Sequence, residues 1–168
     1  MQQDQFVRQV VQDGDDPEIR AVLQDVCRIT GMGFAAVARV TEDRWIACQV
    51  LDQIEFGLEP GGELAIGTTI CNDIRASGQR VVIDHVQEDR DWCTHPTPIL
   101  YGFKSYVSLP LVLADGSFYG TLCAIDPEPR LLKDTAKLAQ LDRCAERVVR
   151  LLARAPAGRG VGLSGGDR

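Results

Sequence analysis

The sequence lacks long hydrophobic runs. No apolar stretch approaches the roughly 18 residues that would suggest a membrane-spanning helix. The amino-terminal segment MQQDQFVRQV also lacks the charged and then apolar arrangement of a secretory signal peptide. We therefore expect a soluble, cytoplasmic protein without a membrane partner.

Positive charge is scarce and nowhere concentrated. The chain has 24 acidic residues against 18 basic ones, a net charge of −6, and no run of Lys or Arg longer than two residues. Proteins that bind nucleic acids need a basic patch to contact the phosphate backbone. The composition therefore argues against a nucleic-acid partner.

Closely spaced cysteines are also missing, since none of the six forms a CxxC motif. A chain of 168 residues can bury a core without the support of disulfide bonds. Four cysteines lie in apolar helix or strand patterns and are expected to be small core residues: Cys27, Cys48, Cys123 and Cys144.

The amino-terminal part is predicted to be helical. In residues 1–12 apolar side chains recur on one helix face, and we assign residues 1–16 to an N-terminal helical extension. Asp16 before Pro17 is a favourable helix start, because aspartate caps free N–H groups and proline suits the first turn. The pattern then predicts a core-packing helix that ends at Gly31.

Six runs rich in apolar and β-branched residues are predicted to be strands. They cover residues 34–40, 44–51, 63–66, 80–84, 104–113 and 118–126. Short turn-like segments join the first pair and the last pair, which predicts two antiparallel hairpins. The run at 80–84 is nearly all apolar and is expected to be a central strand.

Two further helices complete the pattern. A short helix at 70–76 can be capped by Thr68 or Thr69. A long helix over about 131–153 carries an apolar stripe that suits a sheet or a partner helix, and this favours a homodimer. The Gly-rich segment 154–168 is predicted to be a disordered tail or a linker.

The order of elements predicts an α+β fold, because hairpins require antiparallel pairing and the short loops exclude a doubly wound sheet. Residues 84–103 have neither a helix period nor a strand period. Irregular segments longer than about 12–15 residues are uncommon in compact domains and are usually functional. This one contains both histidines and several aromatic residues, so we interpret it as a lid over a pocket.

The candidate ligand-binding residues lie in this lid and in the elements beside it. Small-molecule sites combine apolar walls with a few convergent polar groups. In the lid the candidates are His85, Asp89, Trp92, Cys93, His95 and Tyr101, and outside it they are Cys71, Tyr106, Ser108 and Cys123. Cys71 is expected at the first turn of the short helix, where the helix dipole lowers a thiol pKa.

Catalytic and metal-binding patterns are absent from the sequence. The cysteines and histidines of the lid region lack the short paired spacings of structural zinc sites, so no metal is expected. No Ser-His-Asp order, phosphate-binding Gly-rich motif or pair of catalytic carboxylates is visible. We therefore expect no enzyme activity.

The stretch from Gly67 to Asp126 resembles the GAF domain family, the small sensory modules of bacterial signalling proteins. The most specific motifs are HPTPILYGFKSYVSLPL, which begins at His95, and GTLCAID, which begins at Gly120. The resemblance covers residues 17–153. It implies a central antiparallel sheet of about six strands, with the N- and C-terminal helices on one face and a ligand pocket under the lid on the other.

Branches of this family bind different molecules, so the fold alone does not name the ligand. The Asn-Lys-Phe-Asp-Glu signature of cyclic-nucleotide-binding members is absent. Bilin-binding members attach a tetrapyrrole to a lid cysteine, and Cys93 has a similar spacing to Pro110. Against this, Thr94 separates Cys93 from His95, and the prolines after His95 would disrupt the helix that carries such a cysteine.

Free methionine sulfoxide reductases are a second alternative. They resemble the chain at Cys71 and Cys93, but two acidic residues of their last strand correspond here to Cys123 and Ile125. The leading expectation is a sensory domain that binds a small molecule under the lid and signals through its terminal helices. A histidine kinase or cyclase is the expected effector, and a bilin is a possible cofactor that the sequence does not require.

Overall fold

The computed structural model describes residues 4–160, except for the side chains of residues 99–100 and 154–160. Its helices are α1 (Gln5–Gly14), α2 (Pro17–Thr30), α3 (Cys71–Ser77), α4 (Pro96–Tyr101) and α5 (Thr135–Gly160). Its strands are β1 (Phe34–Val40), β2 (Trp45–Asp52), β3 (Glu63–Leu64), β4 (Val81–Ile83), β5 (Ser105–Val112) and β6 (Phe118–Asp126). Two short 3-10 turns, Ile66–Thr68 and Val86–Glu88, precede α3 and follow β4.

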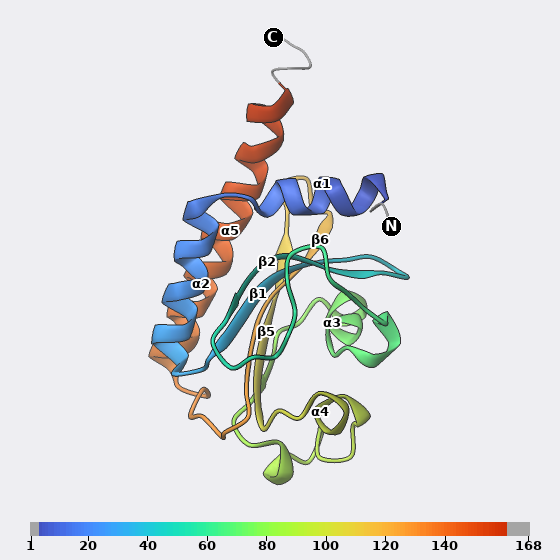
Figure 1. Ribbon diagram of the computed structural model, residues 1–168. Coiled ribbons are helices and arrows are strands. Elements are labelled where there is room, and N and C mark those ends of the chain that lie inside the picture. Colours follow the sequence, from blue (N-terminus) through green and yellow to red (C-terminus); the bar gives the residue numbers. More distant parts are fainter. Residues whose placement is uncertain (1–3, 161–168) are drawn as a thin grey trace.

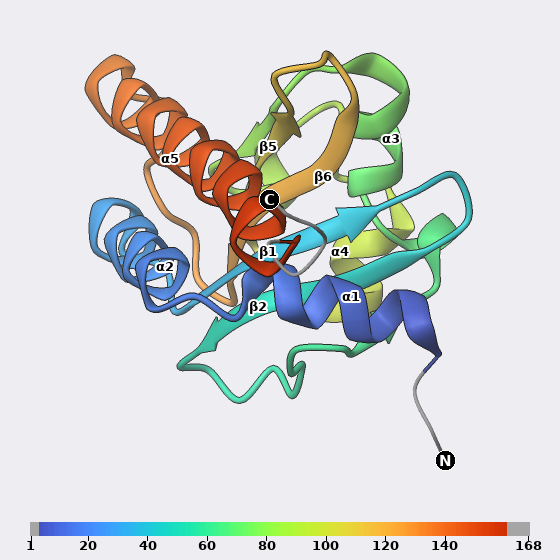
Figure 2. The same cartoon turned by 90° about the horizontal axis from the view of Figure 1, so that it is seen from above.

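The six strands form one antiparallel sheet in the order β3-β2-β1-β6-β5-β4. Helices α1, α2 and α5 lie on one side of the sheet, while α3 and α4 lie on the other (Figure 1). Seen from above, α2 and α5 run side by side (Figure 2). The expected α+β architecture, with terminal helices on one face of a six-stranded sheet, is confirmed.

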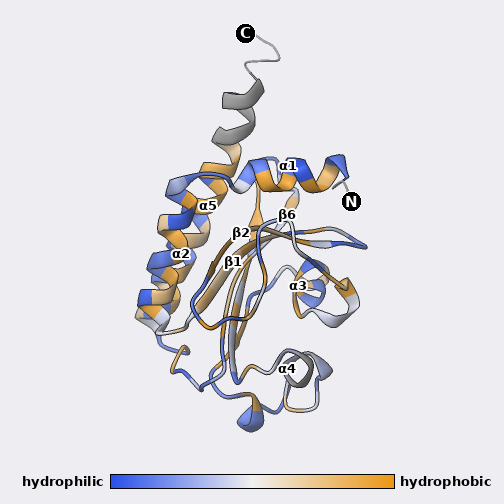
Figure 3. Cartoon of the chain, in the orientation of Figure 1, coloured by the Kyte–Doolittle hydropathy of each residue, from blue (hydrophilic) through white to orange (hydrophobic). Residues whose placement is uncertain are grey.

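The main core lies between the sheet and the terminal helices. Along β6, Leu122 and Ala124 face this core, whereas Cys123 and Ile125 face the opposite side, as the alternation of a strand requires. Val7 and Val10 bring α1 into the same core. The strands are mostly hydrophobic in Figure 3, while α1 and α2 alternate between polar and apolar residues.

Helix α2 begins and ends where the sequence predicts. The Asp16 side chain accepts the N–H of Glu18, Pro17 occupies the first turn, and Gly31 closes the helix with a left-handed φ of 75°. The prediction that this helix packs on the core is confirmed, because one of its faces is buried: Ile19, Val22, Leu23, Val26 and Cys27. The four cysteines predicted as core residues are buried as well.

Strand β4 lies at the edge of the sheet, so its predicted central position is wrong. It pairs with β5 alone. Both of its faces are nevertheless covered, because Val82 packs against the helix-side core while Val81 and Ile83 pack on the opposite side. An apolar run therefore indicates that both faces of a strand are covered, and it does not require a neighbouring strand on each side.

The lid is more regular than the sequence predicts, since residues 84–103 contain the Val86–Glu88 turn and α4. The prolines do not prevent this helix. Pro96 occupies its first turn, where the missing N–H would have had no partner within the helix. The predicted capping of α3 by Thr68 or Thr69 is also wrong, because both hydroxyls donate backwards, to the carbonyls of Ala65 and Ile66.

Helix α5 begins later and ends later than predicted. Asp134 caps it by accepting the N–H groups of Ala136 and Lys137, at 2.8 and 3.1 Å. The helix runs to Gly160 and so includes residues 154–160 of the segment predicted to be a disordered tail. Residues 161–168 lie outside the described part of the chain.

The apolar stripe of α5 is covered by the chain's own sheet and by α2. Leu141, Val148 and Leu152 are buried in the core that these elements share. The stripe is therefore not available to a partner helix, and it cannot be the reason for a dimer. The outer face of α5 is charged, with Asp142, Arg143, Glu146 and Arg150.

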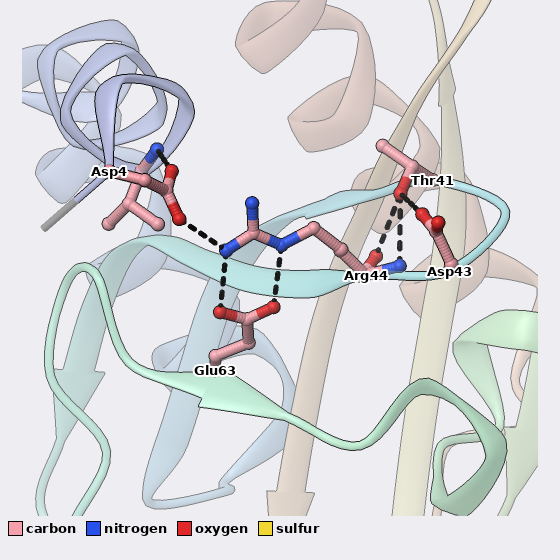
Figure 4. Close-up of polar contacts among 6 residues, drawn as sticks. Asp4, Thr41, Asp43, Arg44 and Glu63 are labelled. Carbon is pink, nitrogen blue, oxygen red and sulfur yellow. Dashed lines mark hydrogen bonds and ion pairs between the residues drawn. The ribbon is translucent and has the colours of Figure 1, made fainter.

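One arginine joins three parts of the fold that are far apart in the sequence. The Arg44 guanidinium binds both carboxylate oxygens of Glu63 on β3, at 2.7 and 2.8 Å, and Asp4 before α1 at 2.9 Å (Figure 4). The hydrogen bond from Arg44 is the main reason why the pKa values of Asp4 and Glu63 lie below their ordinary values. Arg44 thereby holds α1 and β3 against the β1–β2 hairpin.

We expect Glu63→Gln to lower stability modestly at neutral pH, by less than about 1 kcal/mol, because the pair is partly exposed to solvent. The folded-state pKa of Glu63 lies below its ordinary value of 4.5, so the stabilisation is present above that value. It is lost as the pH falls through the lower folded pKa. Urea unfolding at about pH 7 and about pH 3 should show a difference between the two proteins that shrinks in acid.

The matched control for this test is Glu59→Gln, a change of an exposed carboxylate in the neighbouring loop. It should leave the unfolding midpoint nearly unchanged at both pH values. A difference between wild type and Glu63→Gln that stays constant or grows in acid would contradict the role of this ion pair.

Candidate functional site

The face of the sheet opposite the terminal helices carries a second hydrophobic cluster, which encloses a cavity. Helix α3, helix α4 and the loop between β2 and β3 cover this face. The cavity has a volume of about 50 Å³. It is lined mainly by aromatic and aliphatic side chains: Phe34, Trp45, Phe56, Leu58, Leu64, Thr69, Ile70, Cys71, Thr97, Tyr101, Phe103, Tyr106, Cys123 and Ile125.

Polar groups gather at the sheet side of this cavity, around the thiol of Cys71. The sulfur lies 3.1 Å from the Thr121 hydroxyl, 3.5 Å from the Tyr106 hydroxyl and 3.8 Å from the Ser108 hydroxyl. The three hydroxyls come from β5 and β6, so these strands place polar groups next to Cys71, the first residue of α3. All four residues are buried.

The charge state of this cluster follows from its hydrogen bonds. The pKa of Cys71 is lowered, first by a hydrogen bond from Cys123 and then by bonds from Thr121 and Tyr106, against the opposing effect of burial. The pKa of Cys123 is raised, chiefly because its proton is shared with Cys71, and burial adds to the rise. Burial likewise raises the pKa of Tyr106. Cys71 is therefore the thiol that ionises first.

Trp45 brings a further polar group to the cavity. Its side chain is 3% exposed and lines the cavity, yet its indole N–H has no hydrogen-bond partner among the described residues. The N–H of Trp45 also helps to lower the pKa of Cys71, after Cys123, Thr121 and Tyr106, although its geometry is not that of a hydrogen bond. A buried donor without a partner is costly in a folded protein, and such a group is often satisfied by a ligand or a water molecule.

A wider cleft of about 480 Å³ lies next to the cavity. Six side chains line both spaces and form the wall between them: Phe56, Leu58, Leu64, Tyr101, Phe103 and Ile125. Phe56 packs against Phe34 and Tyr101, with ring centres 5.0 and 6.0 Å apart. Rotation of these side chains would join the cavity to the cleft.

Helix α4 forms the roof and is held in place by polar contacts. The Thr97 hydroxyl donates to the carbonyl of Thr68 at 2.6 Å, and the hydroxyls of Tyr101 and Thr68 are also 2.6 Å apart. His95 caps the helix, since its Nδ1 accepts the N–H of Thr97 at 3.2 Å, and its Nε2 lies 3.5 Å from Asp73 on α3. His95 therefore positions the roof and does not line the cavity.

The structure brings together half of the predicted site residues. Cys71, Tyr101, Tyr106 and Cys123 line the cavity, and Ser108 contacts Cys71. Trp92 stacks on His95, with ring centres 4.9 Å apart, and lies outside the cavity wall. Three candidates lie elsewhere in the lid: His85, Asp89 and Cys93.

These three residues make local contacts. His85 pairs with Glu88, three residues further along the chain, at 3.3 Å. Asp89 accepts the N–H of Asp91 and lies 3.6 Å from the Lys133 ammonium group. Cys93 is exposed. The three residues were predicted from their place in the lid, but their side chains do not line the cavity.

Most of the apolar wall, and the N–H donor of Trp45, were not among the predicted site residues. Trp45, Phe34 and Phe56 belong to β2, β1 and the loop after β2, which are distant in sequence from the lid. Thr121 was also missed, although it precedes the predicted Cys123 by two residues and so shares its face of β6. That period of two is the signal by which Thr121 could have been found.

Within residues 4–160, no group of three or more His, Cys, Asp or Glu side chains is arranged to hold a metal ion. No helix in the same part of the chain is long and apolar enough to cross a membrane.

Comparison with known proteins identifies the architecture. The model of the GAF domain family matches residues 16–154. No curated protein matches the chain.

Solved structures share the fold at low sequence identity. The GAF domain of a phosphoenolpyruvate-protein phosphotransferase from Acinetobacter is 12% identical, with a TM-score of 0.64 over 92% of this chain and 94% of that one. The GAF domain of a two-component sensor histidine kinase from Bacillus halodurans is 10% identical, with a TM-score of 0.64 over 86% and 97%. A type II free methionine-R-sulfoxide reductase from Thermoplasma acidophilum is 11% identical, with a TM-score of 0.63 over 86% and 96%.

Proposed function

The chain belongs to the GAF domain family, and from this premise we propose that it is a sensory domain that binds a small molecule in the cavity beneath α4. The observation that carries the proposal is the N–H of Trp45, which has no hydrogen-bond partner among the described residues, in a cavity walled mainly by apolar side chains. Ligand sites have this composition, with a few polar groups that orient an apolar molecule. The sensor histidine kinase of Bacillus halodurans, which contains a GAF domain of this fold, supports a role in signalling.

The dimensions of the site suggest the class of ligand. The cavity of about 50 Å³ alone is too small for a metabolite, but the adjoining cleft of about 480 Å³ is in the usual range for ligand pockets. A ligand that moves Phe56, Leu58 or Tyr101 aside would occupy both spaces. It would be a flat, largely apolar molecule with one hydrogen-bond acceptor that reaches the Trp45 N–H.

The signal would pass from the cavity to the terminal helices through β6. This strand presents Cys123 to the cavity and Leu122 to the core beneath α5. The carboxyl-terminal end of α5 projects beyond the sheet and α1 (Figure 1), which suits a connection to another protein segment. We propose a histidine kinase or cyclase domain as effector, a homodimer formed through surfaces of the terminal helices other than the buried stripe of α5, and a cytoplasmic location.

Fluorescence of Trp45 tests the ligand half of this proposal. The chain has two tryptophans, so Trp92→Phe leaves Trp45 as the sole indole reporter. A library of flat heteroaromatic metabolites and tetrapyrroles, titrated into this variant, should contain compounds that change its emission and raise the melting temperature. A second variant, Leu58→Trp, is made in the wild-type chain, and its ligand binding is measured by thermal shift. The larger side chain narrows the junction between cavity and cleft, so it should weaken ligand binding at least about tenfold.

The matched control is Leu131→Trp, which adds the same side chain at a position that is 78% exposed. It should leave ligand affinity unchanged. If no compound alters Trp45 emission, or if both tryptophan variants weaken binding equally, the proposed site is wrong. Size-exclusion chromatography with light scattering tests the dimer separately, and a monomer at high concentration would contradict it.

The two alternatives, a bilin-binding domain and a methionine sulfoxide reductase, each have their own test. Covalent bilin attachment would give a visible absorption band after coexpression with bilin synthesis, and Cys93→Ala would abolish it. Thioredoxin-dependent reduction of free methionine sulfoxide, lost in Cys71→Ser or Cys93→Ser, would show an enzyme like that of Thermoplasma acidophilum. We propose that the domain has neither property, because Cys71 is buried in the cavity wall while Cys93 is exposed outside it.

A further inference from the structure

Two thiols face the same small cavity from different elements. Cys71 is the first residue of α3 and Cys123 lies in β6, 52 positions later in the chain by their residue numbers. Both are buried, and both line the cavity. The two thiols therefore face one small space from opposite elements.

Strand register explains why the two thiols meet. Cys123 is directly opposite Ser108 in the β5–β6 ladder, and Thr121 lies two residues before Cys123 on the same face. The Cys71 sulfur contacts both of these hydroxyls, at 3.8 and 3.1 Å. The Cys71 sulfur therefore lies next to the part of β6 that carries Cys123.

The other four cysteines are in different surroundings. Cys27, Cys48 and Cys144 lie in the core on the opposite side of the sheet. Burial raises the pKa of Cys27 to about 11, and it also raises the pKa of Cys144. Cys93 is exposed in the lid. The fold therefore gives Cys71 and Cys123 a common environment that none of the other thiols shares.

The cavity suits a very small polar molecule. A volume of about 50 Å³ admits a molecule of the size of one or two waters, and little more without movement of the wall. The unpartnered N–H of Trp45, 3% exposed, offers a hydrogen bond to an oxygen atom held beside the sulfur. The hydroxyls of Tyr106 and Thr121 face the same sulfur.

We propose that Cys71 and Cys123 form a peroxide-reactive dithiol site, which closes to a disulfide inside the cavity. The Cys71 sulfur attacks one oxygen of hydrogen peroxide, the O–O bond breaks, and the leaving hydroxide takes up a proton to become water. Cys71 is then a sulfenic acid. The Cys123 sulfur attacks the Cys71 sulfur, the S–O bond breaks, and the proton of Cys123 leaves in a second water.

This reaction balances without a further reactant. Hydrogen peroxide is reduced by two electrons to two water molecules, and the two thiols are oxidised by two electrons to one disulfide. The groups around Cys71 support its role as the attacking sulfur, because they lower its pKa and so favour the thiolate, which is the nucleophilic form. The reaction is stoichiometric, goes beyond the proposed ligand binding and requires no ligand.

The test uses the full chain with Cys93→Ser, which removes the exposed thiol and leaves the dithiol site intact. Addition of one equivalent of hydrogen peroxide to the folded protein should reduce its mass by two hydrogen atoms. Peptide mapping should find Cys71 joined to Cys123, and a thiol reductant should reverse the change. Cys71 should react at least about tenfold faster than Cys27, as measured by the loss of each free thiol.

A second cysteine replacement separates the two roles. With Cys93→Ser and Cys123→Ser together, Cys71 should stop at the sulfenic acid, which dimedone captures. With Cys93→Ser and Cys71→Ser together, Cys123 should remain a free thiol under the same treatment. Circular dichroism of each variant verifies that the fold is retained, and the Cys93→Ser protein alone suffices for the main result if a double variant fails to fold.

Three outcomes would overturn the proposal. One is that Cys71 and Cys123 stay reduced in the folded Cys93→Ser protein. Another is that they react no faster than Cys27, and the third is that Cys71 is linked to a cysteine other than Cys123. Because no ligand takes part, these outcomes leave the proposed sensory function untouched, and a failed ligand search leaves the dithiol site untouched.

Discussion

Replacing Gly120 by alanine is expected to destabilise the protein by about 3 kcal/mol or more. Gly120 lies in β6 opposite Arg39 of β1. A Cβ atom at this position would overlap the carbonyl oxygen of Ala38 and would lie 2.8 Å from its carbonyl carbon and 2.9 Å from the Val40 nitrogen. These are backbone atoms of a strand paired on both sides, so they cannot move aside as a flexible side chain would.

Equilibrium unfolding in urea, followed by circular dichroism, measures this effect. The matched control is Gly67→Ala, because a Cβ at Gly67 meets no atom within 4 Å. The control variant should differ from wild type by less than about 1 kcal/mol. A loss of similar size in both variants would mean that the close approach of β1 and β6 at Gly120 is not the cause.

Removing the carboxylate of Asp126 should cost about 3 kcal/mol of stability. This side chain is 4% exposed and accepts the N–H groups of Gly33 and Glu128, each at 2.9 Å. It also pairs with the Arg130 guanidinium at 3.1 Å. In Asp126→Ala the Gly33 N–H loses its acceptor, and the connections from α2 to β1 and from β6 to α5 lose their common anchor.

Urea unfolding again provides the measurement, and Asp126→Asn should fall between alanine and wild type because the amide oxygen keeps one acceptor. Asp115→Ala is the matched control. Asp115 also accepts the N–H two residues further along, that of Ser117, but it lies in an exposed hairpin turn, so its loss should lower stability much less than the loss of Asp126. Equal losses at the two positions would show that burial of Asp126 does not matter.

The helices and hairpins were predictable because their signals are local. Asp16, Pro17 and Gly31 mark the limits of α2 by backbone chemistry that does not depend on the rest of the chain. The segments 34–40 and 118–126 were predicted with the bounds that the structure shows. The edge position of β4 was not predictable, because an apolar strand can be covered on both faces without a second strand beside it.

The residues of the candidate site were also predictable only in part. Cys71, Tyr101, Tyr106, Ser108 and Cys123 were found because they lie in or beside the segment that resembles the family motifs. His85, Asp89 and Cys93 lie in the same segment but not in the cavity wall. Composition identifies the residues of a lid, whereas the direction in which each side chain points depends on how the lid packs.

The sequence by itself determined an α+β chain with two antiparallel hairpins and terminal helices, since periodicity and capping act over a few residues. Tertiary structure alone decided that Trp45 of β2 and Cys123 of β6 meet Cys71 of α3 in one cavity. These residues are brought together by strand order and register, which depend on pairing between distant segments. The tertiary fold likewise decided that the stripe of α5 packs on its own sheet, because a helix stripe is equally suited to a sheet and to a partner helix.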